Sequence, residues 1–227
     1  MFETKKFDSV CTECSVQKKC FDSFGNEGGV GLFPFNETAV NIMAEKTGSK
    51  FYGLYTYYVP LEEEERITFS ERVFSPSIDE NGRIFGIRYN DGSANIVTGH
   101  IDSLSLTEIT KFDNGRQIHS TYLDGNFLYF DLTDNHHRDI HTLNISDIDS
   151  TSQKAIPIIA NDWDSRSPAK SNDKLVISDD RTGIFNIYLD SDESSGFITN
   201  VIGGAFTPSI SEDGRILYSI YKDGGYR

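Results

Sequence analysis

Basic residues and long apolar runs are scarce in this chain. It has 21 Lys and Arg against 35 Asp and Glu, a formal net charge of −14, and its cations are scattered rather than striped. Because an acidic surface repels phosphate backbones and anionic lipids, we expect no nucleic-acid partner and no membrane-surface partner. No apolar run reaches the length of a membrane-spanning helix, and the first residues, MFETKKFD, lack the apolar core of a secretory signal.

Catalytic and cofactor-binding motifs are absent as well. The sequence contains no Gly-x-Ser-x-Gly nucleophile elbow, no Gly-x-Gly-x-x-Gly fingerprint, no phosphate-binding loop and no Cys-x-x-Cys-His haem motif. The sequence therefore predicts that this chain is not an enzyme and needs no cofactor, although a structural calcium or zinc ion stays open.

A sustained helical period is also missing, whereas strand-forming and turn-forming residues are abundant. The chain has 16 Phe, 11 Tyr and 19 Gly but only two Met. Short runs rich in aromatic and β-branched residues alternate with Gly, Asp, Asn and Ser, a pattern typical of short antiparallel strands. The chain is therefore predicted to be almost wholly β.

One segment recurs along the chain. Residues 74–87 read FSPSIDENGRIFGI and residues 206–220 read FTPSISEDGRILYSI, and when these two copies are aligned at Pro76 and Pro208, the equivalent positions of related segments are 34, 119 and 168. A spacing of 40 to 49 residues is that of four-stranded propeller blades. The sequence predicts an all-β propeller with about four complete blades and an incomplete one, at approximately 34–73, 74–116, 117–164, 165–206 and 207–227.

The last of these units stops where the repeat requires another strand. A blade that ends early leaves an unpaired edge exposed. We therefore expect the chain to be a fragment of a longer protein, with residues 1–33 forming the tail of a preceding blade or an insertion. In the predicted blades, Ile84, Phe85, Leu128, Phe130, Val176, Ile187 and Leu217 are expected to pack blade against blade.

The segment 175–189, LVISDDRTGIFNIYL, together with 197–219, resembles the TolB-like propeller repeat, which carries a Pro-x-Trp-Ser-Pro-Asp-Gly turn and a Ser-Asp-Arg-x-Gly turn. The resemblance is good over 165–227, fair over 74–115 and weak over 34–73 and 117–156. Ile78 and Ile210 stand where the repeat has Trp. It assigns structural roles, including intrablade bonds of the Asp-Arg pair, to these repeat residues: Pro76, Gly82, Asp180, Arg181, Gly183, Pro208, Asp213 and Gly214.

This resemblance implies a non-catalytic scaffold of the bacterial cell envelope, often periplasmic, that works through protein contacts made by its loops. Two alternatives stay open. The chain could be the gating propeller of a prolyl-oligopeptidase-type serine peptidase whose catalytic domain lies beyond Arg227, or a metal-dependent carbohydrate-active propeller. The fold alone selects none of these functions, because propellers carry many.

Three cysteines, Cys11, Cys14 and Cys20, lie within ten residues. They could bind zinc or an iron-sulfur cluster, but a tetrahedral zinc site needs a fourth ligand and the nearest His in sequence is His100. A loop disulfide between two of them in an oxidising compartment, with the third thiol left over, is the simpler interpretation.

His137 and His141 form the other candidate metal site, in the segment 136–141, HHRDIH. Residues four apart share one face of a strand, so the two imidazoles could bind a transition metal if the turn ends by His137. An exposed structural turn, predicted over 133–139, is the simpler interpretation. The Asp-rich turns (Asp131 and Asp134, Asp147 and Asp149, Asp179 and Asp180, Asp190, Asp192 and Glu193) could hold calcium but also suit turn chemistry, and Glu62–Glu65 is predicted to be a solvated turn.

Overall fold

The computed structural model describes residues 26–27, 30–31, 52–58, 60, 62–69, 71–103, 105–134, 136–146 and 154–227. The chain divides into two compact units, Met1–Phe51 and Tyr52–Arg227. In the first unit the described strands β1 (Asn26–Glu27) and β2 (Val30–Gly31) pair antiparallel. The predicted first blade, 34–73, lies partly outside the described residues.

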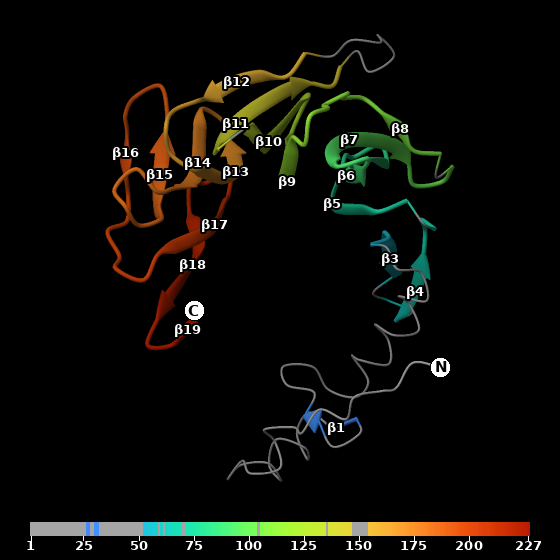
Figure 1. The fold of residues 1–227 in the computed structure, drawn as a ribbon, viewed down its shortest axis with the longest axis horizontal. Coiled ribbons are helices and arrows are strands. Elements are labelled where there is room, and N and C mark those ends of the chain that lie inside the picture. The colour runs from blue at the N-terminus through green and yellow to red at the C-terminus, as the bar shows by residue number, and fades with distance from the viewer. Residues whose placement is uncertain are drawn as a thin grey trace. The chain divides into compact units, whose positions relative to one another are not determined.

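The second unit is a series of antiparallel sheets, each built from strands consecutive in sequence (Figure 1). A two-stranded sheet comes first, with β3 (Tyr55–Tyr58) and β4 (Glu63–Arg66). The four sheets that follow are called blades A to D. Their strands are β5 (Val73–Ile78), β6 (Arg83–Asn90), β7 (Ser93–His100) and β8 (Thr107–Glu108) in blade A; β9 (Gln117–Asp124), β10 (Phe127–Asp134), β11 (His137–Asn144) and β12 (Ile156–Ile159) in blade B; β13 (Ser165–Ser171), β14 (Lys174–Asp179), β15 (Asn186–Asp190) and β16 (Ser195–Phe197) in blade C; and β17 (Ala205–Ile210), β18 (Ile216–Lys222) and β19 (Gly225–Tyr226) in blade D.

Successive blades meet through their first strands, since β5 packs on β9, β9 on β13 and β13 on β17. Between β5 and β9, the Thr121 hydroxyl donates to the Ser75 carbonyl oxygen at 2.9 Å and the Thr121 amide donates to the Ser75 hydroxyl at 3.3 Å. First strands that lie side by side at the inner edge are the defining feature of a propeller. The predicted fold class is thereby confirmed, as an open rather than closed series of blades. The described part of the chain contains no α-helix, and no helix in it is long and apolar enough to cross a membrane.

The repeated Pro has a structural reason. In blades A, C and D the first strand is interrupted by a β-bulge at the residue before the Pro and at the Pro itself. Because a bulged residue has no ladder partner for its amide, a Pro without an N–H fits there. The residue before each Pro adopts a positive φ: Ser75 (50°) before Pro76, Ser167 (51°) before Pro168, and Thr207 (47°) before Pro208.

Blade B replaces this Pro with Ser120, and the structure shows what compensates. The bulge lies at the equivalent place on β9. Ser120 retains an amide hydrogen, which donates to Asp131 Oδ1 at 2.7 Å, and its hydroxyl donates to the same oxygen at 2.8 Å. The side chain of Asp131 is buried at only 1% exposure. Asp131 is therefore part of the bulge of blade B rather than of a solvated turn.

Apolar residues from facing blades form the core. Between blades A and B a cluster of fully buried residues includes Phe85, Ile96, Leu128 and Phe130, and between blades C and D another includes Val176 and Ile187. Of the residues predicted to pack between blades, Ile84, Phe85, Leu128, Phe130, Val176 and Ile187 are confirmed as buried. The prediction for Leu217 is wrong: it is 76% exposed, on β18 of the last sheet.

Two predicted turns are also corrected. Glu63–Arg66 is strand β4, in which Glu64 pairs with Tyr57 and Arg66 with Tyr55. A run of four glutamates reads as a solvated turn, but in a two-stranded sheet exposed acidic side chains are equally compatible with a strand. The segment predicted to turn over 133–139 is mostly strand, because β10 continues to Asp134 and β11 begins at His137.

Candidate functional site

The loop between β12 and β13, residues 160–164, carries the single Trp of the chain. It is called the Trp163 loop below. The Trp163 amide donates to Asn161 Oδ1 at 2.8 Å, and the Asn161 amide donates to Asp139 Oδ1 on β11 at 3.2 Å. The Trp163 ring nonetheless remains 48% exposed. A large aromatic side chain is therefore presented to solvent from a loop whose backbone is fixed by hydrogen bonds.

Asp164 ties the other end of the Trp163 loop to its neighbours. Its Oδ1 accepts from the Arg138 amide at 3.0 Å, and its own amide donates to Asp180 Oδ1 at 2.8 Å. Its Oδ2 accepts from Arg166 Nη2 at 2.5 Å, and the Arg166 guanidinium lies 4.3 Å from the centroid of the Phe185 ring. Burial raises the pKa of Asp164, but the hydrogen bonds from Arg166 and Arg138 outweigh it and hold that pKa below its usual range. Asp164 is thus ionised at neutral pH and joins blade B to blade C.

The predicted Asp-Arg pair is made with a different carboxylate. Arg181 Nε and Nη2 donate to Asp179 Oδ1 and Oδ2 at 2.8 and 2.7 Å, and the Ser165 hydroxyl donates to Asp179 Oδ2 at 3.0 Å. Asp179 is completely buried. Asp180, the neighbour singled out from the sequence, instead accepts the hydrogen bond from the Asp164 amide and so fixes the Trp163 loop.

The three turn glycines of the predicted repeat residues all adopt the left-handed conformation, with φ of 80° at Gly82, 85° at Gly183 and 81° at Gly214. A side chain at these positions would strain the turn. In blade D, Asp213 Oδ2 pairs with Arg215 Nε at 2.9 Å within the same exposed turn.

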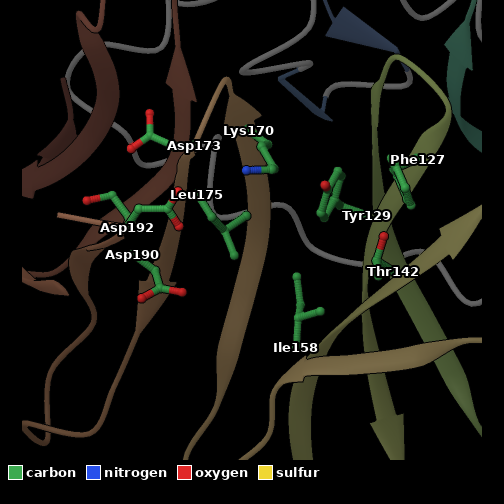
Figure 2. A pocket seen from close by; sticks show the side chains of 10 residues that line it. Phe127, Tyr129, Thr142, Ile158, Lys170, Asp173, Leu175, Asp190 and Asp192 are labelled. Carbon is green, nitrogen blue, oxygen red and sulfur yellow. The ribbon is translucent and has the colours of Figure 1, made fainter. Parts of the chain in front are cut away.

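A cleft of about 320 Å³ lies between blades B and C and is called the blade cleft below (Figure 2). Phe127 and Tyr129 of β10 lie on one side, and three carboxylates of blade C, those of Asp173, Asp190 and Asp192, lie on the other. Asp190 ends β15, and the other two lie in turns. The other lining residues are Thr142, Ile158, Lys170, Leu175 and Ser191. An aromatic and aliphatic wall therefore faces an acidic one.

His137 and His141 both lie on β11, at positions that share a face, but the structure gives them different surroundings. His137 is exposed, whereas His141 is half-buried and stacks on Phe130 with 5.7 Å between ring centroids. Among the described residues no three His, Cys, Asp or Glu side chains gather at a point that could hold a metal ion. Cys11, Cys14 and Cys20 lie outside the described residues.

His141 predicts a pH dependence of stability. Burial lowers the pKa of His141 in the folded protein, so the folded protein favours the neutral ring. The resulting stabilisation is fully present above about pH 6.5, the pKa of an unfolded His, and is lost as the pH falls through the lowered pKa of the folded state. Replacing His141 with Phe, which keeps the stacking on Phe130, is expected to reduce the loss of stability between pH 7.5 and 5. Urea unfolding at several pH values measures this. The exposed His137→Gln is the control, and an equal reduction in that variant would contradict the assignment.

The architecture is that of a β-propeller, and its fold is similar to that of solved TolB structures. Two solved structures share this fold: TolB from Acinetobacter baumannii, with a TM-score of 0.55 and 17% identity, and a putative TolB from Agrobacterium tumefaciens, with a TM-score of 0.59 and 17% identity. The matches cover 73% and 70% of this chain but only 42% and 59% of those proteins. The chain thus spans about half the length of these structures.

Two further comparisons add no assignment. A structure from a study of two prolyl endopeptidases matches with a TM-score of 0.44 and 16% identity, over 65% of this chain and 26% of that one, which is too weak to support a peptidase role. No protein-family model and no curated protein matches the sequence.

Sequence reasoning did not single out Trp163 or the blade cleft. A signal for Trp163 was present, since a lone Trp in the polar segment 161–164, NDWD, has no apolar neighbours with which to enter a core. The blade cleft had no such signal, because its walls come from six strands and two turns spread over residues 127–192.

Proposed function

We propose that this propeller is a non-catalytic scaffold that binds a protein partner, and that the Trp163 loop is the centre of its binding surface. The observation that carries the proposal is the half-exposed Trp163 on a loop whose amides donate hydrogen bonds to Asp139 on β11 and to Asp180 in the turn after β14. By its resemblance to TolB-like repeats we further propose that the chain is a module of a cell-envelope protein, with a periplasmic location. Cell fractionation of the complete protein tests that location.

Trp is the residue most enriched among those that dominate binding energy at protein interfaces, because its large ring buries much area at little cost in side-chain entropy. A loop that is already fixed loses little further freedom on binding. At the base of the loop, the Arg166 guanidinium and the Arg138 backbone amide both donate to the Asp164 carboxylate, and the Asp164–Arg166 pair can contribute to the polar rim that surrounds such an aromatic centre.

Site-specific photocrosslinking tests this proposal. A photoreactive amino acid at position 163 is expected to crosslink one envelope protein in cells, and that protein, once purified, is expected to bind the unmodified chain. Trp163→Ala should then raise the measured Kd roughly 30-fold, which corresponds to a loss of about 2 kcal/mol of binding free energy.

Tyr89 provides a matched control, because it is an aromatic residue with a similar exposed fraction, 41%, on β6 of blade A. Tyr89→Ala should leave the Kd within about twofold of the wild-type value. If Trp163→Ala and Tyr89→Ala have equal effects, or if a label at 163 captures nothing while one at 89 does, the Trp163 loop is not the binding surface.

A further inference from the structure

The blade cleft has an apolar lip that is too exposed to belong to the core. Phe127 lines the cleft and is 42% exposed, and Ile158 lines it from the edge strand β12. Ile156 of β12 pairs with Thr142, another lining residue, so its side chain lies on the same face as that of Thr142, and it is also exposed. Exposed apolar side chains gathered at the mouth of a cleft are typical of an interaction site rather than of ordinary surface.

The opposite lip is acidic, and part of its charge is uncompensated. Asp173 is paired with Lys174 at 3.1 Å, and Asp190 accepts a hydrogen bond from the neutral Ser195 hydroxyl. Asp192 makes no ion pair or hydrogen bond with any described residue. The carboxylates of Asp190, at the end of β15, and Asp192, in the turn that follows, therefore leave negative charge facing the cleft.

Lys170 is the one cation among the lining residues, and its position leaves the acidic lip available. Its Nζ donates to the Asn172 carbonyl at 2.7 Å and lies 6.0 Å from the centroid of the Tyr129 ring. It makes no ion pair with Asp190 or Asp192. A guanidinium is suited to the remaining space, because it can bond two carboxylates through its fork of donors while its flat face contacts an aromatic wall.

We propose that the blade cleft binds a segment of a partner protein that places an arginine side chain against Asp190 and Asp192 and an adjacent apolar side chain against Phe127 and Ile158. This inference rests on the proposed protein-binding function, because the segment is taken to belong to the protein partner. The acidic lip disfavours anionic ligands, and the absence of a three-ligand cluster among the described residues disfavours a bound metal ion as the occupant.

The test uses the purified chain labelled with nitrogen-15 and the blocked dipeptide N-acetyl-leucyl-arginine amide. Binding, with a Kd on the order of 1 mM, is expected to shift the amide resonances of Tyr129, Ser191 and Asp192. The same peptide with citrulline, which keeps the shape of arginine without its charge, should bind at least tenfold more weakly. The affinity for the arginine peptide should fall as salt rises.

The variant Asp190→Asn with Asp192→Asn should also bind the arginine peptide at least tenfold more weakly, with an otherwise unchanged spectrum that shows it is folded. Asp102→Asn is the control, because that side chain is 85% exposed in blade A and far in sequence from the cleft; it should bind as the wild type does. Absence of shifts, equal binding of the citrulline peptide, or shifts confined to other blades would overturn the proposal. Failure of the Trp163 crosslinking experiment would not alter these results, so the two proposals fail separately.

Discussion

Replacing Asp179 with Ala is expected to lower the free energy of unfolding by about 3 kcal/mol, the lower end of the cost of breaking a buried ion pair, because Asp179 is fully buried but the Arg181 side chain is 30% exposed. The Asp179 carboxylate is fully buried, and it accepts both prongs of the Arg181 guanidinium as well as the Ser165 hydroxyl. Without it, the Arg181 charge and the Ser165 hydroxyl lose the partner for which they were desolvated. Equilibrium urea unfolding measures the loss.

Two comparison variants isolate the cause. The double variant Asp179→Leu with Arg181→Met removes both charges and retains an apolar side chain to lie against the Tyr188 ring, on which the Arg181 guanidinium now lies at 4.3 Å. It should recover most of the loss, since a buried pair replaced by apolar groups costs far less than a broken one. Asp192→Ala, at an exposed turn, should stay within about 0.5 kcal/mol of wild type. A double variant as unstable as the single one would show that the loss has another origin.

The blade architecture was predictable because it is repeated. The Pro, the Gly turn and the alternating apolar run are each weak evidence for a blade. Their recurrence together at a similar spacing is what predicts the propeller. The resemblance also pointed to the Asp-Arg turn, yet it could not show that Arg181 bonds Asp179 while Asp180 bonds the next loop. Two adjacent carboxylates are chemically equivalent in a sequence, and only the alternation of the strand decides which one enters the core.

Blade B shows a second limit. The sequence repeat aligns His119 with the Pro of the other copies, whereas the bulge places Ser120 at that position, and the sequence groups Asp131 with the Asp-rich turns. The pairing of β9 with β10 brings Ser120 and Asp131 together across the bulge. There the Asp131 carboxylate accepts the hydrogen bond of the Ser120 amide, which a Pro would not have. A compensating pair eleven residues apart carries no local signature, because neither residue is unusual for its own segment.

The candidate sites were less predictable than the fold for a related reason. The Trp163 loop is fixed by Asp139 and Asp180, which belong to two different blades, and the blade cleft exists only once blades B and C have packed. The histidines, in contrast, were prominent in the sequence, but His141 is explained by stacking on Phe130. A residue that is conspicuous in this sequence, such as His141, therefore need not belong to a candidate site.

Phe130→Ala is expected to destabilise the protein by about 3–5 kcal/mol, the usual cost of removing a large aromatic side chain from a packed core. Phe130 is fully buried between blades A and B, where its ring centroid lies 6.3 Å from that of Phe112 and 5.7 Å from that of His141. The collapse of neighbouring strands cannot fill the space, because β9 and β11 hold β10 on both sides. Equilibrium urea unfolding at pH 7.5, where His141 is neutral, gives the cleanest value.

Leu217→Ala supplies the contrast, since sequence alternation assigns Phe130 and Leu217 to the same core role and only the structure separates them. At 76% exposure, Leu217 has little apolar area left to lose, and its replacement should change the free energy of unfolding by no more than about 0.5 kcal/mol. A loss at Leu217 as large as that at Phe130 would mean that another sheet or chain covers β18 in solution. A small loss at both would instead show that blades A and B are not packed as described, and that the interblade core does not stabilise this propeller.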